Sequence, residues 1–531
     1  MRTFSSYGPV STKSNYFVPR TDLLNLTREY LLGKNQEEGG HYITVWASRQ
    51  CGKTWLLREL ARELKKSPLF CAAIISLQQM FDIENPIDIA NAILADISEQ
   101  TERNLPKVCN FIEFQNIFTR EHFDKPLILI LDEFDALKET AITSLVAVLR
   151  NLYIERSRDN KSAFERNIIL HGVALIGIRS VLGVENKSGS PFNVQKCLHV
   201  PYLTYDEVCE MYHWYEREYG QKIDQDVIDR VFYVTNGQPG LVSWFGELLT
   251  ERYNEKKTEP IDMKLFNYVY RDALSVLPNN NTINLISKAT DPEYKPVILN
   301  LFRTNGKTVF EFEDPAFNYL YMHGVISFER DGDFRYAKFP CQFVQEKLFN
   351  RFAREIYSVN GKILPDPFIE IDPIINDNEI NVRNLMKLYQ SYFVENHDYI
   401  LSQAPRRKDN RIYEATYHFN LYSWLCSFFQ TFKEVSINPE FPTGNGKIDL
   451  LLKHRKIRIY GLELKSFTNL SELKKSITQA ARYGKSLGLS VISLVVFFDT
   501  KINDEFRTRF EKDHTDSETG MKVELIMLET F

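Results

Sequence analysis

Residues 42–55, YITVWASRQCGKTW, join a short apolar run to a helical pattern through a loop that ends in Gly52-Lys53-Thr54. These three residues fit the last positions of the nucleotide-binding pattern GxxxxGK[ST], and Ala47 stands where that pattern has its first glycine. In such a loop, backbone N–H groups at a helix N-terminus surround phosphates, the lysine contacts phosphate oxygens and the hydroxyl binds Mg²⁺. The stretch therefore predicts a site for ATP and Mg²⁺. The candidate nucleotide contacts are Ala47, Gln50, Cys51, Gly52, Lys53, Thr54 and Trp55.

A second stretch, residues 127–137 (LILILDEFDAL), supplies the acids that such a site requires. Asp132 follows the apolar run and would hold Mg²⁺ together with Thr54, while Glu133 would polarise the attacking water. A buried strand that ends in acids at its solvent edge explains this stretch equally well when it is taken alone. The two stretches in this order favour a nucleotide-binding domain.

Four apolar runs, 42–47, 69–77, 126–133 and 167–178, alternate with helical patterns. Short runs that are apolar throughout suit strands buried on both faces of a parallel sheet. Residues 200–275 have helical patterns. Residues 280–355 predict a helix, a hairpin that turns at Asp331-Gly332-Asp333 and a further helix. Prolines and acids over 362–382 indicate a linker, and a last α/β unit follows.

The motifs of the first 350 residues resemble the AAA-like ATPases of the STAND or archaeal-ATPase type. The resemblance includes NYFVPR (15–20), SPFN (190–193) and TNGQPGLV (235–242) beside the two stretches above. It implies that Tyr16 to Arg20 lie near the adenine, that Gly237 to Gly240 belong to a helical lid, and that a winged helix follows. Arg179 would be a γ-phosphate sensor by this resemblance, or a solvated loop arginine without it. Such modules often act as nucleotide-dependent switches.

Residues 445–467, NGKIDLLLKHRKIRIYGLELKSF, read as two apolar strands joined by a basic turn. Glu463 and Lys465 share a strand face, and the hairpin places that face next to the one that carries Asp449. Two carboxylates on neighbouring strands can chelate Mg²⁺, and a lysine can stabilise a developing anion. A salt bridge at a sheet edge is the simpler explanation of Glu463 and Lys465.

The ordered set of residues around this hairpin resembles the PD-(D/E)XK nuclease superfamily, although GKID lacks the proline of the family name. The resemblance implies a metal site of Asp449, Glu463 and an acid on the preceding helix. Glu414 is the best candidate for that acid, and Glu440 is a weaker one. It also implies roles for Gln479 and Tyr483 on the following helix. The scattered histidines show no metal spacing and are expected to be ordinary core or surface residues.

Charge and composition agree with a nucleic-acid partner. Residues 406–485 hold 15 Lys and Arg against 7 Asp and Glu, a difference of +8, whereas the whole chain has a net charge of −5. A local basic region attracts polyanions. Seven cysteines without a CxxC pattern indicate reduced thiols, and no apolar run is long enough for a membrane span or a secretory signal. We therefore expect a cytoplasmic protein.

The sequence as a whole predicts an α/β multidomain protein. Its expected parts are a parallel-sheet P-loop ATPase core (1–200), a helical lid (201–275), a winged-helix-like region (276–360), a linker (361–410) and a restriction-endonuclease-like α/β domain (411–531). The expected function is an ATPase, with Glu133 as its catalytic residue, whose nucleotide state regulates a Mg²⁺-dependent nuclease with catalytic residues Asp449, Glu463 and Lys465. DNA is favoured over RNA, and a homo-oligomer is compatible with this design. The alternatives are a non-cutting switch with an inactive nuclease fold and an ATPase that works on protein partners.

Overall fold

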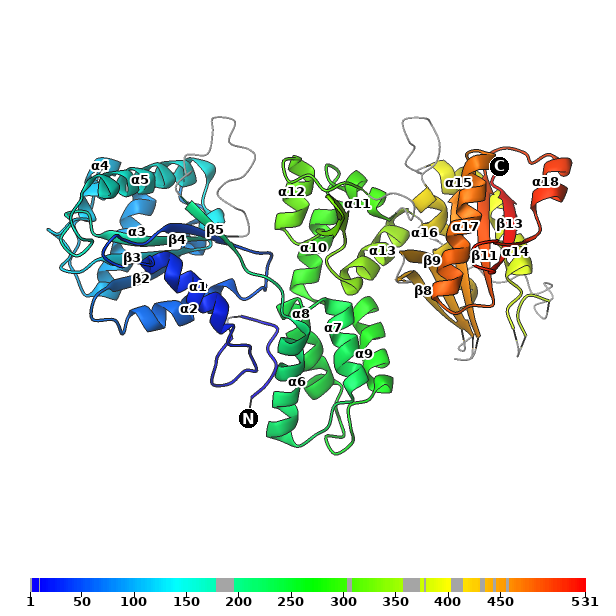
Figure 1. The fold of residues 1–531 in the computed structure, drawn as a ribbon, viewed down its shortest axis with the longest axis horizontal. Helices are drawn as coiled ribbons and strands as arrows, with labels where there is room; N and C mark the ends of the chain where they lie inside the picture. The colour runs from blue at the N-terminus through cyan, green and yellow to red at the C-terminus, as the bar shows by residue number, and fades with distance from the viewer. Residues whose placement is uncertain are drawn as a thin grey trace. The chain divides into compact units, whose positions relative to one another are not determined.

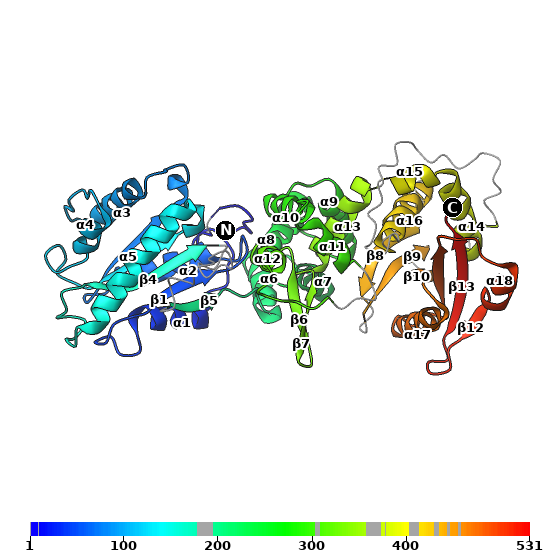
Figure 2. The same ribbon diagram turned by 90° about the horizontal axis from the view of Figure 1, so that it is seen from above.

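The protein divides into two compact units, which are described separately (Figures 1 and 2). The computed structural model describes residues 2–8, 10–177, 195–302, 308–356, 373–376, 379–402, 414–429, 435–442, 446–454 and 458–531. The first unit consists of Met1–Lys288, Phe310–Glu329 and Phe339–Phe343. The second consists of Ala289–Val309, Arg330–Lys338 and Val344–Phe531.

The first unit is built on a parallel five-stranded sheet in the order β2-β3-β4-β1-β5. Its strands are β1 (Tyr42–Trp46), β2 (Cys71–Ser76), β3 (Leu127–Asp132), β4 (Leu170–Gly177) and β5 (Gln195–His199). The four apolar runs of the sequence form β1 to β4, so the predicted parallel sheet is confirmed. β5 was not foreseen, because QKCLH lacks an apolar run.

Helices bury both faces of this sheet. Leu127, Leu129 and Leu131 of β3 pack with α3 (Pro86–Thr101), α4 (Phe111–Ile117) and α5 (Glu139–Arg158). Ile128 and Ile130 face the other way and pack with α1 (Thr21–Leu32) and α2 (Lys53–Leu64). Side chains of a strand alternate between faces, so a strand covered on both sides must be apolar throughout. This is why residues 127–131 of β3 are all leucine or isoleucine before the acidic end at Asp132.

Further helices of the first unit follow the sheet in sequence. They are α6 (Tyr205–Tyr219), α7 (Gln225–Thr235), α8 (Pro239–Glu247) and α9 (Met263–Ser275), with α12 (Pro315–Met322) later in the chain. Thr204 and Glu207 form a capping box that fixes the start of α6. Gln238 caps α8, whose first residue is Pro239. The helical pattern expected over 201–275 is therefore present, while its role as a lid stays a prediction.

Residues 276–360 contain α10 (Asn280–Thr290), α11 (Lys295–Leu301), α12, β6 (Ser327–Asp331), β7 (Phe334–Lys338) and α13 (Gln342–Ile356). Strands β6 and β7 form a two-stranded sheet, so the hairpin predicted at residues 331–333 is confirmed. The division between the two compact units runs through this region. A winged helix here remains a prediction.

The second unit contains a mixed sheet in the order β12-β13-β11-β10-β9-β8. These strands are β8 (Val435–Pro442), β9 (Lys447–His454), β10 (Arg458–Ser466), β11 (Val491–Phe498), β12 (Asp513–Thr515) and β13 (Lys522–Glu529). β10 pairs antiparallel with β9 and parallel with β11. The predicted hairpin of residues 445–467 is thus at the centre of an α/β unit.

Helices cover both faces of this second sheet (Figure 2). α17 (Leu470–Ser486) lies on one face and packs its apolar side against β11 and β13. α14 (Val382–Glu395) and α16 (Glu414–Phe428) lie on the other, where Tyr417 stacks on Phe497 with ring centroids 4.5 Å apart. The unit also contains α11, most of α13, α15 (His397–Ser402) and α18 (Asp504–Phe510).

Within the linker expected over residues 361–410, the structure describes residues 373–376 and 379–402, and these include two helices. Residues 382–402 form α14 and α15, and Arg383 of α14 donates to a Glu524 side-chain oxygen at 3.1 Å on β13. The amphipathic pattern of α14 buries Leu385, Met386 and Tyr389, and this pattern follows directly after the proline-rich stretch. Across the described residues, no helix combines the length and the apolarity that a membrane crossing requires.

Arg156 provides a test of the first unit. It is buried in α5, and it donates to the carbonyl oxygens of Gly40 at 2.6 Å, Leu170 at 3.1 Å and His171. We expect Arg156→Met to lower the free energy of unfolding by about 2–4 kcal/mol, because buried carbonyls would lose their donor. The measurement is urea unfolding of the full chain followed by tryptophan fluorescence, since Trp46, Trp55, Trp214 and Trp244 lie in this unit.

The control is Arg158→Met, which removes an exposed arginine from the same helix. An equal urea midpoint for the two variants would contradict the role given to Arg156.

Candidate nucleotide site and candidate metal centre

The phosphate loop lies between β1 and α2, at the carboxyl edge of the parallel sheet. Gln50 has φ 58° and Gly52 has φ 89°, both in the left-handed region, and Gly52 immediately precedes α2. A Cβ placed on Gly52 would meet no atom within 4 Å, so there is open space in front of the helix N-terminus. Such an N-terminus, with its free N–H groups, favours an anion.

Lys53, the first residue of α2, is folded back onto the loop. Its Nζ donates to the carbonyl oxygens of Ala47 at 2.6 Å and Ser48 at 2.9 Å. Burial lowers the pKa of this ammonium, although Cys51, Asp135 and Asp132 act in the opposite direction. A phosphate would therefore offer Lys53 a charged partner in place of two neutral carbonyls.

Thr54 and Asp132, the predicted Mg²⁺ ligands, are side by side. Thr54 Oγ1 donates to Asp132 Oδ2 at 3.1 Å, and the backbone N–H of Glu133 donates to Asp132 Oδ1 at 3.0 Å. Burial raises the pKa of Asp132. The hydroxyl and the carboxylate that a cation would join are thus already in contact.

Glu133 ends the apolar strand in an unusual conformation. Its φ of 56° is in the left-handed region, which non-glycine residues seldom adopt and which often marks a functional position. Burial, followed by Asp132 and Asp135, raises the pKa of its carboxyl group. Among the described residues, Glu133 Oε2 has no hydrogen-bond partner. This carboxylate is suited to accept a proton from a water molecule.

The other predicted nucleotide contacts have different surroundings. Ala47 is fully buried in the apolar cluster with Val45 and Leu56, which explains a methyl group where the pattern has glycine. Cys51 is buried, with its Sγ 3.1 Å from Ser48 Oγ. Trp55 packs against Phe17, at 5.7 Å between ring centroids. Arg179 and the SPFN stretch lie outside the described residues.

The segment that leads into α8 contacts the phosphate loop. Gln238 Nε2 donates to the carbonyl oxygen of Arg49 at 3.1 Å, and the N–H of Gly240 donates to that of Gln50, also at 3.1 Å. A Cβ on Gly240 would come within 2.4 Å of Gln50 Oε1, so this position requires glycine. The GQPG pattern placed Gly237 to Gly240 in the predicted helical lid, but the sequence did not reveal that this segment forms hydrogen bonds with the phosphate loop.

We predict that Lys53→Ala weakens ATP binding by at least about 100-fold, because a buried ammonium that would face phosphate oxygens is lost. The measurement is titration of the full chain with a fluorescent ATP analogue in the presence of Mg²⁺. Lys66→Ala removes an exposed lysine shortly after the same helix and should bind like the wild type. Equal affinities for the two variants would rule out the assigned role of Lys53.

A second cluster of predicted site residues lies in the second unit, where the hydrogen-bonded pairing of β9 and β10 ends. Their pairing runs as far as Leu450 opposite Leu462, and one residue further along Asp449 stands opposite Glu463. There Asp449 Oδ2 accepts the backbone N–H of Leu464 at 2.7 Å, in place of a strand partner. Asp449, Glu463 and Lys465 are all buried. The predicted residues therefore meet inside the unit and not at a solvated sheet edge.

Lys465 lies among three acids. Its Nζ is 2.9 Å from Glu463 Oε1 and 3.4 Å from Glu414 Oε1, and it also donates to the Leu464 carbonyl oxygen at 2.9 Å. Burial alone would lower the pKa of Lys465, but Glu414, Glu463 and Asp449 together raise it. The lysine therefore carries its charge, and the structure brings Glu414 to the cluster as predicted.

Glu463 is the least solvated acid of this cluster, with no exposed surface. Burial, reinforced by Asp449 and Glu414, raises its pKa to about 8, even though Lys465 acts in the opposite direction. Glu463 Oε2 has no hydrogen-bond partner in the part of the chain that the structure describes. A buried carboxylate oxygen without a donor is a position where a divalent cation would be favourable.

The sequence analysis missed a further ligand, His418. Its Nε2 lies 3.0 Å from the backbone carbonyl oxygen of Asp449, which can only accept, so we assign the proton to Nε2. Its Nδ1 then presents a lone pair at 3.2 Å from Glu440 Oε1 and 3.8 Å from Asp449 Oδ1. Burial lowers the pKa of His418 to about 3, so the ring is neutral.

His418, Glu440 and Asp449 form a candidate metal centre, since their ligand atoms all lie within 4.8 Å of one another. Three acceptors that face one another are stabilised by a shared cation. A proton on Glu440 would also reduce the repulsion among these three acceptors. Such a proton binds readily, since burial, with Asp449, raises the pKa of Glu440 to about 7. The spacing of Glu414 and His418, four residues apart on one helix, was the signal available in the sequence.

Two further residues fix the orientation of Glu440. Lys447 forms an ion pair with Glu440 Oε2 and donates to the Leu301 carbonyl oxygen at 3.3 Å. Gln345 Nε2 donates to the same Glu440 oxygen at 3.1 Å. With Oε2 held in this way, Oε1 is the atom that faces His418.

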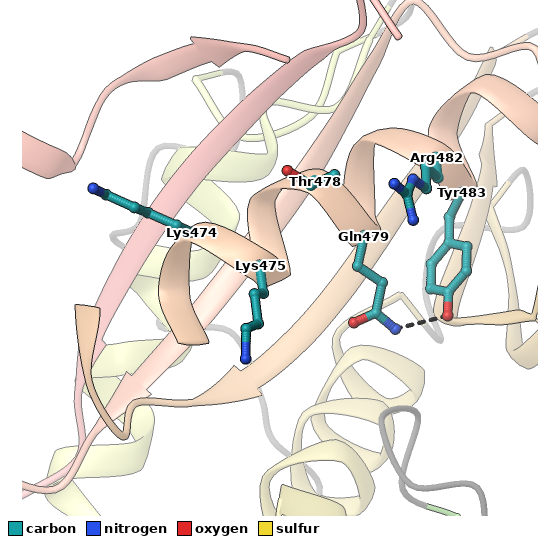
Figure 3. Close-up of a pocket in the computed structure, with 6 residues that line it drawn as sticks. All are labelled: Lys474, Lys475, Thr478, Gln479, Arg482 and Tyr483. Carbon is teal, nitrogen blue, oxygen red and sulfur yellow. Dashed lines mark hydrogen bonds between the residues drawn. The ribbon is translucent and has the colours of Figure 1, made fainter. Parts of the chain in front are cut away.

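Gln479 and Tyr483 lie on α17, as predicted, and contact each other (Figure 3). Gln479 Nε2 donates to Tyr483 Oη at 2.7 Å. A Cβ on Gly446, next to the start of β9, would lie 2.7 Å from Tyr483 Oη. Tyr483 therefore lies close to Gly446, the residue just before the strand that carries Asp449.

We predict that His418→Asn weakens binding of Mn²⁺, a probe for divalent ions, by about 10–100-fold, because a ligand atom of the centre is lost. The measurement is titration of Mn²⁺ into the full chain, with free ion followed by electron paramagnetic resonance. His397→Asn, at a partly exposed histidine of the same unit, is the control. Unchanged Mn²⁺ affinity in the His418 variant would remove this residue from the centre.

Comparison with known proteins supports the assignment of the first unit. Residues 36–174 match the family model described as an AAA domain, a span that contains β1 to β3 and most of β4. The chain therefore carries an AAA-like P-loop ATPase domain, as its phosphate loop predicted. No curated protein matches the chain.

Among solved structures, the chain is similar to the Walker-type ATPase PABY2304 of Pyrococcus abyssi, at 14% identity over 65% of this chain and 99% of that one, with a TM-score of 0.42. It is also similar to the Aeropyrum pernix ORC1 protein, solved in complex with DNA, at 16% identity over 64% and 95%, with a TM-score of 0.34. The third is the Thermotoga maritima RuvB Holliday junction branch migration motor, at 13% identity over 61% and 93%, with a TM-score of 0.34. Likenesses this low say nothing of what the chain binds or acts on.

Proposed function

We propose that the chain, which carries an AAA-like ATPase domain, is an ATP-regulated nuclease that hydrolyses phosphodiesters of nucleic acid, with DNA favoured over RNA. One observation carries the proposal: Glu414, Asp449, Glu463 and Lys465 converge in a single cluster, in which every residue except the partly exposed Glu414 is buried. A structural salt bridge needs one acid and one lysine, whereas this cluster gathers three acids around one cation. Burying surplus like charges costs stability, which favours a functional reason for them.

A bound Mg²⁺ would supply Lewis-acid charge at the phosphate and a more acidic water. Asp449, Glu463 and Glu414 would hold it, and His418 and Glu440 offer further ligand atoms around Asp449. Lys465 would keep a positive charge beside the scissile phosphate, because its three acid neighbours raise its pKa.

The ATPase residues have complementary tasks. Lys53 would exchange its two carbonyl partners for phosphate oxygens, and Thr54 and Asp132 would hold the nucleotide's Mg²⁺. Glu133 would accept the proton of the attacking water, since burial and neighbouring acids raise its pKa. ATP can regulate the nuclease only if it binds one arrangement of the protein more tightly than another. A homo-oligomer would provide such arrangements.

The alternative function is a non-cutting ATPase switch that keeps an inactive nuclease fold. It is favoured by the two lysines within the acidic cluster, which consists of Glu414, Glu440, Asp449 and Glu463. Lys465 already pairs with Glu463, and Lys447 already pairs with Glu440. It is also favoured by the depth of the cluster, since Glu463 has no exposed surface.

The two functions are separated by a cleavage assay. Supercoiled plasmid and labelled DNA and RNA strands are incubated with Mg²⁺, with and without ATP. We predict that Asp449→Asn lowers the cleavage rate by at least about 100-fold, because a metal ligand is weakened. Lys53→Ala should remove the response to ATP and leave the basal rate unchanged.

Asp504→Asn, which neutralises an exposed acid of the same unit, serves as the matched control. A wild-type protein that is inert on every substrate, with and without ATP, would favour the switch. Cleavage that survives Asp449→Asn would point to a contaminating nuclease.

A further inference from the structure

A surface pocket of about 770 Å³ lies along α17 (Figure 3). The lining residues within the described part of the chain belong to this one helix: Lys474, Lys475, Thr478, Gln479, Arg482 and Tyr483. Every one of these side chains carries a hydrogen-bond donor, three of them are cationic, and none is a carboxylate. This pocket, here called the α17 pocket, is therefore built for an anionic ligand.

The six residues form two rows along the helix. Lys474, Thr478 and Arg482 are spaced four residues apart, and so are Lys475, Gln479 and Tyr483. Residues at this spacing share a helix face and rise by about 6 Å per step. Figure 3 shows Lys475, Gln479 and Tyr483 pointing to the same side of the helix. A repeating row of donors matches a ligand with repeating acceptors better than a single ion.

The positive charges of the α17 pocket are available to a ligand. Lys475 pairs with Glu472 and Arg482 pairs with Glu518, each at 2.8 Å, and all four side chains are more than half exposed. Exposed pairs of this kind contribute little and are screened by salt, so a phosphate can replace the carboxylate.

One end of the pocket reaches the acidic cluster. Tyr483 Oη would be 2.7 Å from a Cβ on Gly446, the residue before β9, and β9 carries Asp449. An acidic cluster by itself repels a polyanion, and a neighbouring row of donors offsets that repulsion. One end of the α17 pocket thus lies next to the strand that carries Asp449 into the buried acidic cluster.

We infer that the α17 pocket binds the sugar–phosphate backbone of a nucleic-acid strand, with successive phosphates along the two rows and one phosphate delivered past Tyr483 to the acidic cluster. The inference rests on the proposed function and specifies its substrate contact. All six side chains address phosphate or sugar oxygens, so the binding is independent of base sequence.

The test is a binding measurement that requires no cleavage. The full chain is titrated, in EDTA and across a range of salt concentrations, into fluorescein-labelled single-stranded DNA, single-stranded RNA and duplex DNA, followed by anisotropy. For a single strand, the slope of log affinity against log salt is negative, and each lost phosphate contact reduces its magnitude by about 0.7. Lys474→Gln/Lys475→Gln should therefore make the slope less steep by about 1.4, and affinity at low salt should fall at least about tenfold.

The matched control is Lys485→Gln/Lys501→Gln, which removes the same charge from two exposed lysines, one of them on α17 outside the pocket. The control should keep the wild-type slope. Equal slopes and affinities for both double variants would overturn the inference, and so would a wild-type protein that binds none of the three ligands. Loss restricted to single strands, or to the duplex, would support it and identify the strand form.

This outcome is separable from that of the cleavage assay. Binding through the α17 pocket without any cleavage would keep the inference and remove the nuclease proposal. Cleavage that is lost with Asp449→Asn, together with unchanged nucleic-acid binding by Lys474→Gln/Lys475→Gln, would support the nuclease proposal and overturn the inference about the α17 pocket.

Discussion

The charge balance around Lys465 is the constraint on which the second unit depends. Three acids surround a single ammonium that is itself almost fully buried, and the acids keep that ammonium protonated. Backbone N–H groups of β10 stabilise two of these carboxylates. Asp449 accepts a hydrogen bond from the Leu464 N–H where the pairing of β9 and β10 ends, and Glu414 of α16 accepts one from the Ser466 N–H at 3.3 Å. Buried charge that is not fully paired reduces stability, and proteins keep such clusters where chemistry requires them.

The first unit handles charge differently. Its phosphate loop leaves an ammonium bonded only to carbonyl oxygens and opens a helix N-terminus to unfilled space. The same loop gives two other carbonyls to Gln238 and Gly240 at the start of α8. A ligand that reorders the loop must therefore alter hydrogen bonds to this helix. This contact is a physical route from nucleotide binding to the helices that follow the sheet.

The acidic centre of the second unit also depends on residues outside the predicted nuclease domain. Gln345 of α13 and the carbonyl of Leu301 reach Glu440 directly and through Lys447. Phe349 of α13 packs on the ring of His418, with centroids 4.6 Å apart. The boundary expected at residue 411 therefore separates side chains that the fold joins. Segments that follow the helical region in sequence form part of the wall of the candidate metal centre.

The sequence alone determined the parts that local patterns encode. Apolar runs of strand length fixed β1 to β4, and Gly52-Lys53-Thr54 with Asp132-Glu133 identified a P-loop domain, because strand, loop and helix are contiguous there. The hairpin with Asp449, Glu463 and Lys465 was also legible, since alternation puts these residues on facing positions. Only the tertiary structure decided the rest. His418 and Glu440 meet Asp449 because α16 and β8 are brought together by packing, and α14, which lies on the sheet, follows directly after the stretch of prolines and acids that had suggested a linker. Contacts between segments that are distant in the sequence produce no periodic pattern along the chain, so they could not be predicted from local sequence.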